Sequence, residues 1–264
     1  MLSLFSLLFI VAVTLAQDAP VKVSCPPKLI RSVGPADHQS LSVEEQSYVT
    51  KRSEEVLPKA WGAYLHSVES TLPPTVSLPS YVTDILSPLR ISRNQDFPKL
   101  GIALSGGGLR AAYFAAGALT SLDGRNRTHP TGTNGVLQAA TYLSALSGGG
   151  WFTTALVQAD FPTVPDLIFP SSNTRPGGSK SRFGGFLTQT DILLPNGSTG
   201  NNSAYFDAIV AELRKKHEAG FPVTITDAWS REIARHFVNG TNDGNILQEG
   251  PHGAGILFSD LRNM

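Results

Sequence analysis

A serine between small residues is the first candidate for chemistry in this sequence. Ser147 lies in the segment Ala145 to Gly149, which has the small-x-Ser-x-small form of a nucleophile elbow, a sharp strand-to-helix turn that exposes a reactive serine. Small neighbours matter because the turn brings the strand and helix backbones close together, where larger side chains would collide. We therefore take Ser147 as the candidate nucleophile. The alternative is that its hydroxyl only caps the helix that follows.

A second glycine-rich turn lies earlier in the chain. Gly106 to Gly108 follow the short apolar run Leu100 to Leu104 and precede the alanine-rich stretch Leu109 to Leu122, an order typical of strand, turn and helix. Arg110 falls in the first helical turn, where a cation costs a few tenths to about 1 kcal/mol unless an anion is nearby. Free glycine N–H groups, the helix end and the guanidinium together predict an anion site. Alternatively, Arg110 pairs with one of the protein's own carboxylates.

The same turn also fits a loose dinucleotide-binding pattern. Gly106 to Ala111 matches G-x-G-x-x-A after a predicted strand, which leaves a dinucleotide-binding oxidoreductase as an alternative function. However, no second strand ending in an acidic residue follows, because Gly124 to Gly135 is a polar loop. Two glycine-rich strand-to-helix turns favour acyl-transfer chemistry, since one can supply a nucleophile and the other an oxyanion hole.

Residues 17–98 are predicted to form a lead-in of helices and extended chain. A capping box at Ser42 and Glu45 marks a helix start, and Pro58 is expected to limit that helix. The expected helices of the lead-in cover residues 42–56, 61–68 and 81–86.

Residues 99–264 are predicted to form an α/β domain with a mixed central sheet flanked by helices. The helix at 109–122 is apolar nearly all round, so we expect it to be buried. The last helix of the domain is expected to be capped by Thr226 or Asp227. The further helices expected here cover residues 151–157, 203–217 and 227–237.

Composition limits the class of protein. Of the 264 residues, 41% are hydrophobic and 16% are charged, which allows a large core and excludes disorder, collagen and coiled coil. Basic and acidic residues are balanced at 21 each, so no long-range positive field attracts nucleic acid, and no nucleic-acid partner is expected. The six histidines form no H-E-x-x-H motif and one cysteine cannot build a thiolate zinc site, so no metal site is predicted.

The N-terminal segment predicts export. Residues 1–16 are apolar and uncharged, too short to span a bilayer comfortably, and end in small residues, so we expect a signal peptide cleaved after Ala16. The alternative is an N-terminal anchor helix. A lone Cys25 is unusual for an exported protein, so we expect its partner to lie outside this chain. Sequons that fit a secreted or cell-surface glycoprotein occur at Asn126, Asn196, Asn201 and Asn239.

The two glycine-rich motifs together resemble a known family. Ser105 to Ala111 and Tyr142 to Trp151 are similar to the paired motifs of fungal phospholipase B, or lysophospholipase, and of its cytosolic phospholipase and patatin-type relatives. The resemblance covers roughly Cys25 to the C-terminus. Other similar segments are Cys25-Pro26, Leu29 to Arg31, Leu41-Ser42, Thr226 to Trp229 and His252 to Asp260.

The resemblance implies a serine acyl hydrolase with a Ser-Asp dyad and neither metal nor cofactor. At the matching positions, Ser147 would attack the ester carbonyl of a lysophospholipid or phospholipid at a membrane or micelle surface. The N–H groups of Gly107 and Gly108 would hold the oxyanion, and Arg110 would meet the phosphate of the head group. The products would be a fatty acid and a glycerophospho-alcohol.

The sequence departs from the family pattern at the elbow and at the dyad. Ala145 replaces the first glycine of the elbow, and Gly150 precedes Trp151 where Ser or Asn is common, both small replacements. The family's aspartate would lie far downstream in an Asp-Gly-rich motif, whereas the pairs beginning at Asp123 and Asp243 predict turns.

Without its aspartate, the catalytic domain is expected to be incomplete. The chain would then bind lipid but hydrolyse it slowly, or be a catalytically inactive lipid-binding relative. A Ser-His-Asp arrangement through His236 or His252 is a further alternative.

Overall fold

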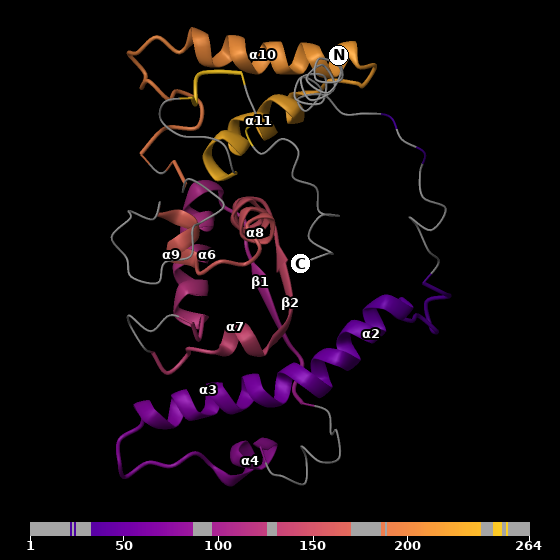
Figure 1. Cartoon of the computed structure of the whole chain (residues 1–264), viewed down its shortest axis with the longest axis vertical. Helices are drawn as coiled ribbons and strands as arrows, with labels where there is room; N and C mark the ends of the chain where they lie inside the picture. The colour runs from indigo at the N-terminus through magenta and orange to yellow at the C-terminus, as the bar shows by residue number, and fades with distance from the viewer. Residues whose placement is uncertain are drawn as a thin grey trace, which may run out of the picture. The chain divides into compact units, whose positions relative to one another are not determined.

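The computed structural model describes residues 22, 24, 33–86, 97–125, 131–169, 186–187, 189–238, 245–249 and 252 (Figure 1). The chain divides into two compact units, Cys25–Phe152 and a second made of Met1–Ser24 with Thr153–Met264. The predicted signal peptide, Cys25, Asn126, Asn239 and Asp243 lie outside the described residues. They remain predictions, as do the domain boundaries after residues 16 and 98.

The lead-in helices run on without the break predicted before Pro58. Helix α2 (Val43–Lys51) continues through a π-helical turn, η1 (Arg52–Val56), into α3 (Leu57–Thr71). The prediction was wrong because Pro58 lies in the first turn of α3, directly after the π turn, in which the Leu57 N–H donates to the Arg52 carbonyl. The wider turn accommodates the proline ring where an α-helix would not. The short helix predicted at 81–86 is confirmed as α4 (Ser80–Thr83) with η2 (Asp84–Leu86).

A parallel pair of strands forms the described sheet of the unit Cys25–Phe152 (Figure 1). Strands β1 (Leu100–Leu104) and β2 (Ala140–Ala145) pair so that Leu104 lies opposite Ala145. Helix α6 (Gly108–Leu122) follows β1, α7 (Val136–Ala139) leads directly into β2, and α8 (Gly148–Gln158) follows β2. The α/β class and the order of strand, glycine turn and helix are confirmed. The mixed character of the sheet stays a prediction, since both described strands are parallel.

Helix α6 is buried on one face only. Ala112, Ala115, Ala116 and Leu119 recur at helical spacing and are buried. Phe114 is 79% exposed on the opposite face, so the expectation that the helix is buried nearly all round was wrong. Small side chains on the buried face allow close approach of the helix to its neighbours.

Side chains of α2 and η1 bind backbone carbonyls at the start of β2. The Tyr48 hydroxyl donates to the Thr141 carbonyl at 2.6 Å, and Arg52 donates to the carbonyls of Gln138 and Ala140. The lead-in therefore holds β2 in place through its side chains.

The predicted capping box at the start of α2 is only half formed. The Glu45 N–H donates to the Ser42 hydroxyl at 3.0 Å. The Glu45 carboxylate does not return to the Ser42 N–H but accepts from the Tyr142 hydroxyl at 3.1 Å. The side chain that was expected to cap a helix thus joins α2 to β2 instead.

A buried aspartate fixes the far end of α6. Asp123 is 1% exposed and accepts from the Arg125 guanidinium at 2.8 and 3.0 Å and from the Gln138 amide at 2.7 Å. Its own carbonyl accepts from Asn134 at 3.1 Å. Burial raises the pKa of Asp123, but the hydrogen bonds and charge of Arg125 and the bond from Gln138 outweigh it and hold that pKa below its ordinary 3.8. The predicted turn at Asp123-Gly124 is confirmed.

Replacement of this aspartate should make stability depend less on pH. Asp123→Asn should lower the free energy of unfolding by about 1–3 kcal/mol at neutral pH, because Arg125 loses its charged partner. The folded-state pKa is depressed, so the wild-type advantage should be full above the ordinary value of 3.8 and disappear as the pH falls through the folded-state pKa. Urea unfolding at several pH values measures this, with exposed Asp84→Asn as the control. An advantage that is unchanged well below pH 3.8 would contradict the assignment.

The second unit contains α9 (Val164–Ile168), α10 (Ser203–Glu218) and α11 (Ile225–Phe237). The helix predicted at 203–217 is confirmed. The cap predicted for α11 was wrong: Thr224 is the N-cap, in a capping box with Asp227 as its third helical residue. Asp227 was taken for the cap because it suits both positions, and only the backbone geometry separates them.

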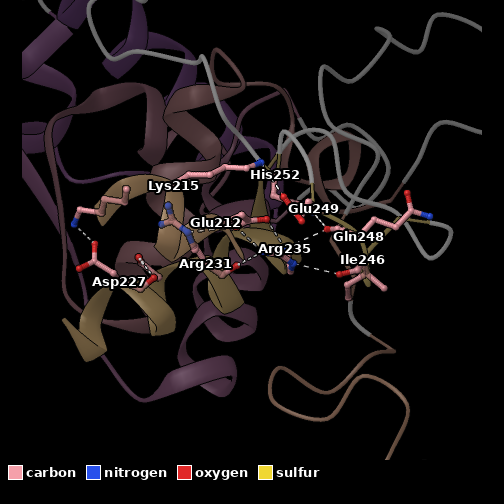
Figure 2. A network of polar contacts seen from close by, with 11 residues as sticks. Glu212, Lys215, Asp227, Arg231, Arg235, Ile246, Gln248, Glu249 and His252 are labelled. Atoms are coloured by element: carbon pink, nitrogen blue, oxygen red, sulfur yellow. Dashed lines mark hydrogen bonds and ion pairs between the residues drawn. The ribbon is translucent and has the colours of Figure 1, made fainter. Parts of the chain in front are cut away.

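A buried ion pair joins α10 and α11 to the segment 245–249 (Figure 2). Arg235 is fully buried and donates to Glu212 at 2.6 Å, and its guanidinium lies 5.7 Å from the ring centre of Tyr205. It also donates to the carbonyls of Ile246 and Gln248, each at 3.2 Å. Loss of Glu212 would leave this cation buried and unpaired, so the pair is expected to hold the segment on the helices.

Among the helices of the described residues, none has the length and apolar character that a transmembrane span requires.

Candidate functional site

Ser147 lies in a strained turn between β2 and α8. Its φ of +50° falls in the left-handed region, which a residue with a side chain rarely adopts without functional or structural cause. The Leu146 N–H donates to the Leu104 carbonyl at 3.0 Å, so the turn is bonded to the end of β1. The Ser147 side chain is exposed, and its hydroxyl makes no hydrogen bond to any described residue. The predicted alternative, a hydroxyl that caps α8, therefore has no bond to support it among these residues.

The two glycine-rich turns pack directly against each other. A methyl group added at Gly106 would lie 2.8 Å from the Ser147 Cβ and 3.5 Å from its Oγ. One added at Gly148 would lie 2.0 Å from the Gly108 carbonyl oxygen, and one at Gly149 would lie 2.7 Å from the Ser105 oxygen. The separations of 2.0, 2.7 and 2.8 Å are shorter than real non-bonded contacts of a methyl group. The glycines are therefore needed because the two turns meet here.

Gly107 and Gly108 turn the chain from β1 into α6. Their φ angles are +136° and +63°, which glycine tolerates at little cost. Their N–H groups donate no hydrogen bond within the described part of the chain. Unpaired N–H groups at a helix start form a region of positive potential suited to an anion or oxyanion. Ser147 and the predicted oxyanion-hole glycines thus belong to two turns in direct contact.

Arg110 is exposed in the first turn of α6. No described carboxylate pairs with it, so the alternative of an internal ion pair finds no partner within the described ranges. Its guanidinium therefore adds positive charge at a helix end that is already positive. This arrangement agrees with the predicted anion site, in which Arg110 has no carboxylate partner among the described residues and lies in the helical turn next to the glycine amides.

Gly106 is a site residue that the sequence pattern did not predict. Its signal was present as the first glycine of the motif, but only the structure shows that its Cα faces the Ser147 side chain. Gly106 is a positioning residue, since any side chain there would displace the serine.

The described acidic and basic side chains do not complete a dyad or triad with Ser147. Asp123 follows the opposite end of the 15-residue helix α6, about 20 Å from the glycine turn at 1.5 Å per residue. His236 is buried in the second unit, where desolvation lowers its pKa and its Nδ1 lies 3.0 Å from the Glu232 carbonyl. His252 Nε2 lies 3.0 Å from the Gln248 carbonyl. Within the described ranges, no group of three metal-ligating side chains occurs.

The family follows from comparison with known proteins. The lysophospholipase catalytic domain family matches residues 100–263, which include both glycine-rich turns. The chain belongs to this family. Membership in a hydrolase family does not favour the oxidoreductase alternative, and it agrees with the resemblance carried by the two motifs.

Fungal relatives extend the match beyond the domain. The chain is 31% identical over 246 residues to probable lysophospholipase 3 of Schizosaccharomyces pombe, covering 93% of this chain and 31% of that protein. It is 31% identical over 253 residues to lysophospholipase 2 of Candida glabrata, covering 96% and 32%. With lysophospholipase 1 of Aspergillus fumigatus the identity is 36% over 155 residues, covering 58% and 24%. The chain therefore spans about a third of the length of the first two relatives, and no solved structure matches it.

The contact between the turns gives a direct test of the site geometry. Gly148→Ala should lower the free energy of unfolding by about 1–3 kcal/mol, because its methyl group would overlap the Gly108 carbonyl. Gly150→Ala is the matched control in the same helix, since nothing lies within 4 Å of its methyl position. This control should be neutral or more stable by up to about 1 kcal/mol. Urea unfolding of both variants measures the difference, and equal stability would refute the close contact.

Proposed function

We propose that this chain provides the nucleophile and oxyanion hole of a lysophospholipase that cleaves fatty acyl esters of lysophospholipids or phospholipids. The observation that carries the proposal is the strained, exposed Ser147 in contact with a glycine turn whose Gly107 and Gly108 amides make no hydrogen bond to a described residue. We take the turn at Ser147, between β2 and α8, as a nucleophile elbow. Family membership and the lysophospholipase names of the fungal relatives support the reaction class.

The proposed chemistry is acyl transfer through serine. The Ser147 oxygen attacks the ester carbonyl, and negative charge develops on the carbonyl oxygen. The N–H groups of Gly107 and Gly108 stabilise that charge, and one such donor typically lowers the barrier by about 3 kcal/mol. The alcohol leaves, and water then releases the fatty acid from the acyl-serine.

Arg110 is the proposed phosphate ligand. The substrate's phosphate is anionic, while its acyl ester is neutral, so a cation beside the oxyanion hole orients the head group without entering the reaction. The exposed guanidinium, without a described carboxylate partner, is available for this contact.

The proton acceptor for Ser147 is proposed to lie outside the described residues. No described carboxylate or imidazole hydrogen-bonds to the Ser147 hydroxyl. A serine without a base is a poor nucleophile, so both labelling and turnover at Ser147 depend on that group. This observation also favours the second candidate function, a lipid-binding protein that keeps the anion site but does not turn substrate over.

Secretion or cell-surface location remains part of the proposal. The apolar, uncharged residues 1–16 and the four sequons support export, with transient contact to a membrane or micelle surface and no nucleic-acid partner. No metal or other cofactor is included in the proposed reaction.

Covalent labelling distinguishes the enzyme from the inactive binder. The intact chain should be labelled by a serine-specific fluorophosphonate, and Ser147→Ala should abolish labelling because the reacting oxygen is removed. Ser144→Ala, an exposed serine on β2, is the matched control and should label like the wild type. Mass spectrometry of the labelled peptide identifies the site. Wild-type protein that is folded but unlabelled would rule out the enzyme and favour the binder.

Competition with lipid tests the role assigned to Arg110. In Arg110→Gln, the lysophospholipid concentration that halves the labelling rate should rise roughly tenfold or more, because a charge-assisted hydrogen bond is lost. A monoacylglycerol, which has the ester but no phosphate, should slow the labelling of the wild type and of Arg110→Gln at the same concentration. A similar loss for both lipids would show that Arg110 shapes the site without contacting phosphate.

A further inference from the structure

Two sequons lie close together in the loop at 195–203, and the structure separates them. Asn196-Gly197-Ser198 and Asn201-Asn202-Ser203 both match N-x-S, so the sequence offers no basis for choosing between them. Both acceptor asparagines are exposed. Their side chains nevertheless make different hydrogen bonds.

At Asn201 the side-chain amide oxygen accepts two hydrogen bonds, whereas the amide nitrogen donates none to a described residue. Asn201 Oδ1 accepts from the Ser203 N–H at 2.9 Å and from the Ser203 hydroxyl at 2.7 Å. The side-chain NH₂ makes no hydrogen bond to a described residue. The sequon serine is therefore bonded to its own acceptor asparagine, and the nitrogen that would receive a sugar lies exposed.

At Asn196 the amide nitrogen closes the loop. Its Nδ2 donates to the Asn201 carbonyl at 2.7 Å. The Ser198 hydroxyl makes no hydrogen bond to Asn196 or to another described residue. The backbone also crowds this residue, because a methyl group at Gly200 would lie 2.0 Å from the Asn196 carbonyl oxygen and 2.8 Å from its Cβ.

The intervening Asn202 holds both asparagines in these positions. Asn202 is buried, accepts from the Asn196 N–H at 2.9 Å, and donates to the carbonyls of Gly197 and Gly200 at 3.0 and 3.1 Å. The helix that follows is anchored by Tyr205, which is buried and donates to the Ile192 carbonyl at 2.8 Å. The loop therefore has one preferred closed form, and a modification that opposes this form costs stability.

We propose that Asn201, and not Asn196, carries an N-linked oligosaccharide. The donor would be a lipid-diphosphate oligosaccharide of the secretory pathway. The Asn201 Nδ2 would form a bond to the anomeric carbon as that carbon's bond to the diphosphate oxygen breaks, with loss of one amide proton. A sugar on Nδ2 leaves Oδ1 bonded to Ser203, whereas a sugar on Asn196 replaces a proton of the donor group that closes the loop.

Site-by-site occupancy of the secreted chain tests this proposal. The chain with its own N-terminus is expressed in a secreting yeast and recovered from the medium and from the endoplasmic reticulum membranes. Treatment with an N-glycosidase in H₂¹⁸O then removes each sugar and converts the asparagine that carried it to ¹⁸O-labelled aspartate, a mark that mass spectrometry detects. We expect the mark on Asn201 in most molecules and on Asn196 in few. Equal marking, a preference for Asn196, or an unmarked Asn201 would overturn the proposal.

Paired variants give a second readout on gel mobility. Ser203→Ala should lose one glycan-sized step, while Ser198→Ala should keep the wild-type mobility. Ser198 is the matched control because it completes the other sequon and makes no described side-chain bond. Ser203→Thr, which retains the hydroxyl, should restore the step. A mobility step lost in Ser198→Ala, or no step lost in Ser203→Ala, would show that the sugar is not on Asn201 alone and would overturn the proposal. If a variant is not recovered, the ¹⁸O occupancy of the wild-type chain decides.

Discussion

The candidate site depends on the close approach of two backbone turns. Strands β1 and β2 are parallel neighbours, so their carboxyl ends release the chain at the same edge of the sheet. At that edge, the Gly106–Gly108 turn and the Ser147–Gly149 turn come within distances that no side chain could fill. The positive φ of Ser147 is the strain that accompanies this approach, and it is sustained because both turns continue directly into helices.

The rest of the first unit holds the elements that carry these turns. Hydrogen bonds from Tyr48 and Arg52 attach the lead-in helices to the start of β2, at the opposite end of the strand from Ser147. Hydrogen bonds from Arg125 and Gln138 to Asp123 fix the end of α6 that lies opposite the glycine turn. The polar side chains that stabilise the unit thus lie away from the turns, and the Gly107 and Gly108 amides and the Ser147 hydroxyl make no hydrogen bond to a described residue. Because these groups are exposed or partly exposed, they can exchange bound water for a ligand.

Local sequence patterns predicted most elements because their causes are local. Apolar spacing and flanking glycines located β1, α6 and α10, and small residues around Ser147 located the second turn. Errors arose where a neighbour in space changed the outcome. Pro58 did not stop the lead-in because a π turn accommodates it, and the Glu45 carboxylate bonds to Tyr142 on β2 in place of its own helix. Phe114 is exposed although the helix is apolar nearly all round, since burial depends on which elements cover a helix face.

Local sequence patterns were enough to predict the residues of the proposed chemistry and to relate the chain to its family, because the spacing of glycine, arginine and serine reflects steric and electrostatic needs of single turns. Which of these residues meet became clear only from the folded chain, in which Gly106 lies against Ser147, Asp123 lies at the far end of α6, and Asn196 and Asn201 make different hydrogen bonds. The physical reason is that contacts between segments distant in the chain depend on strand register and helix packing, which no local pattern encodes.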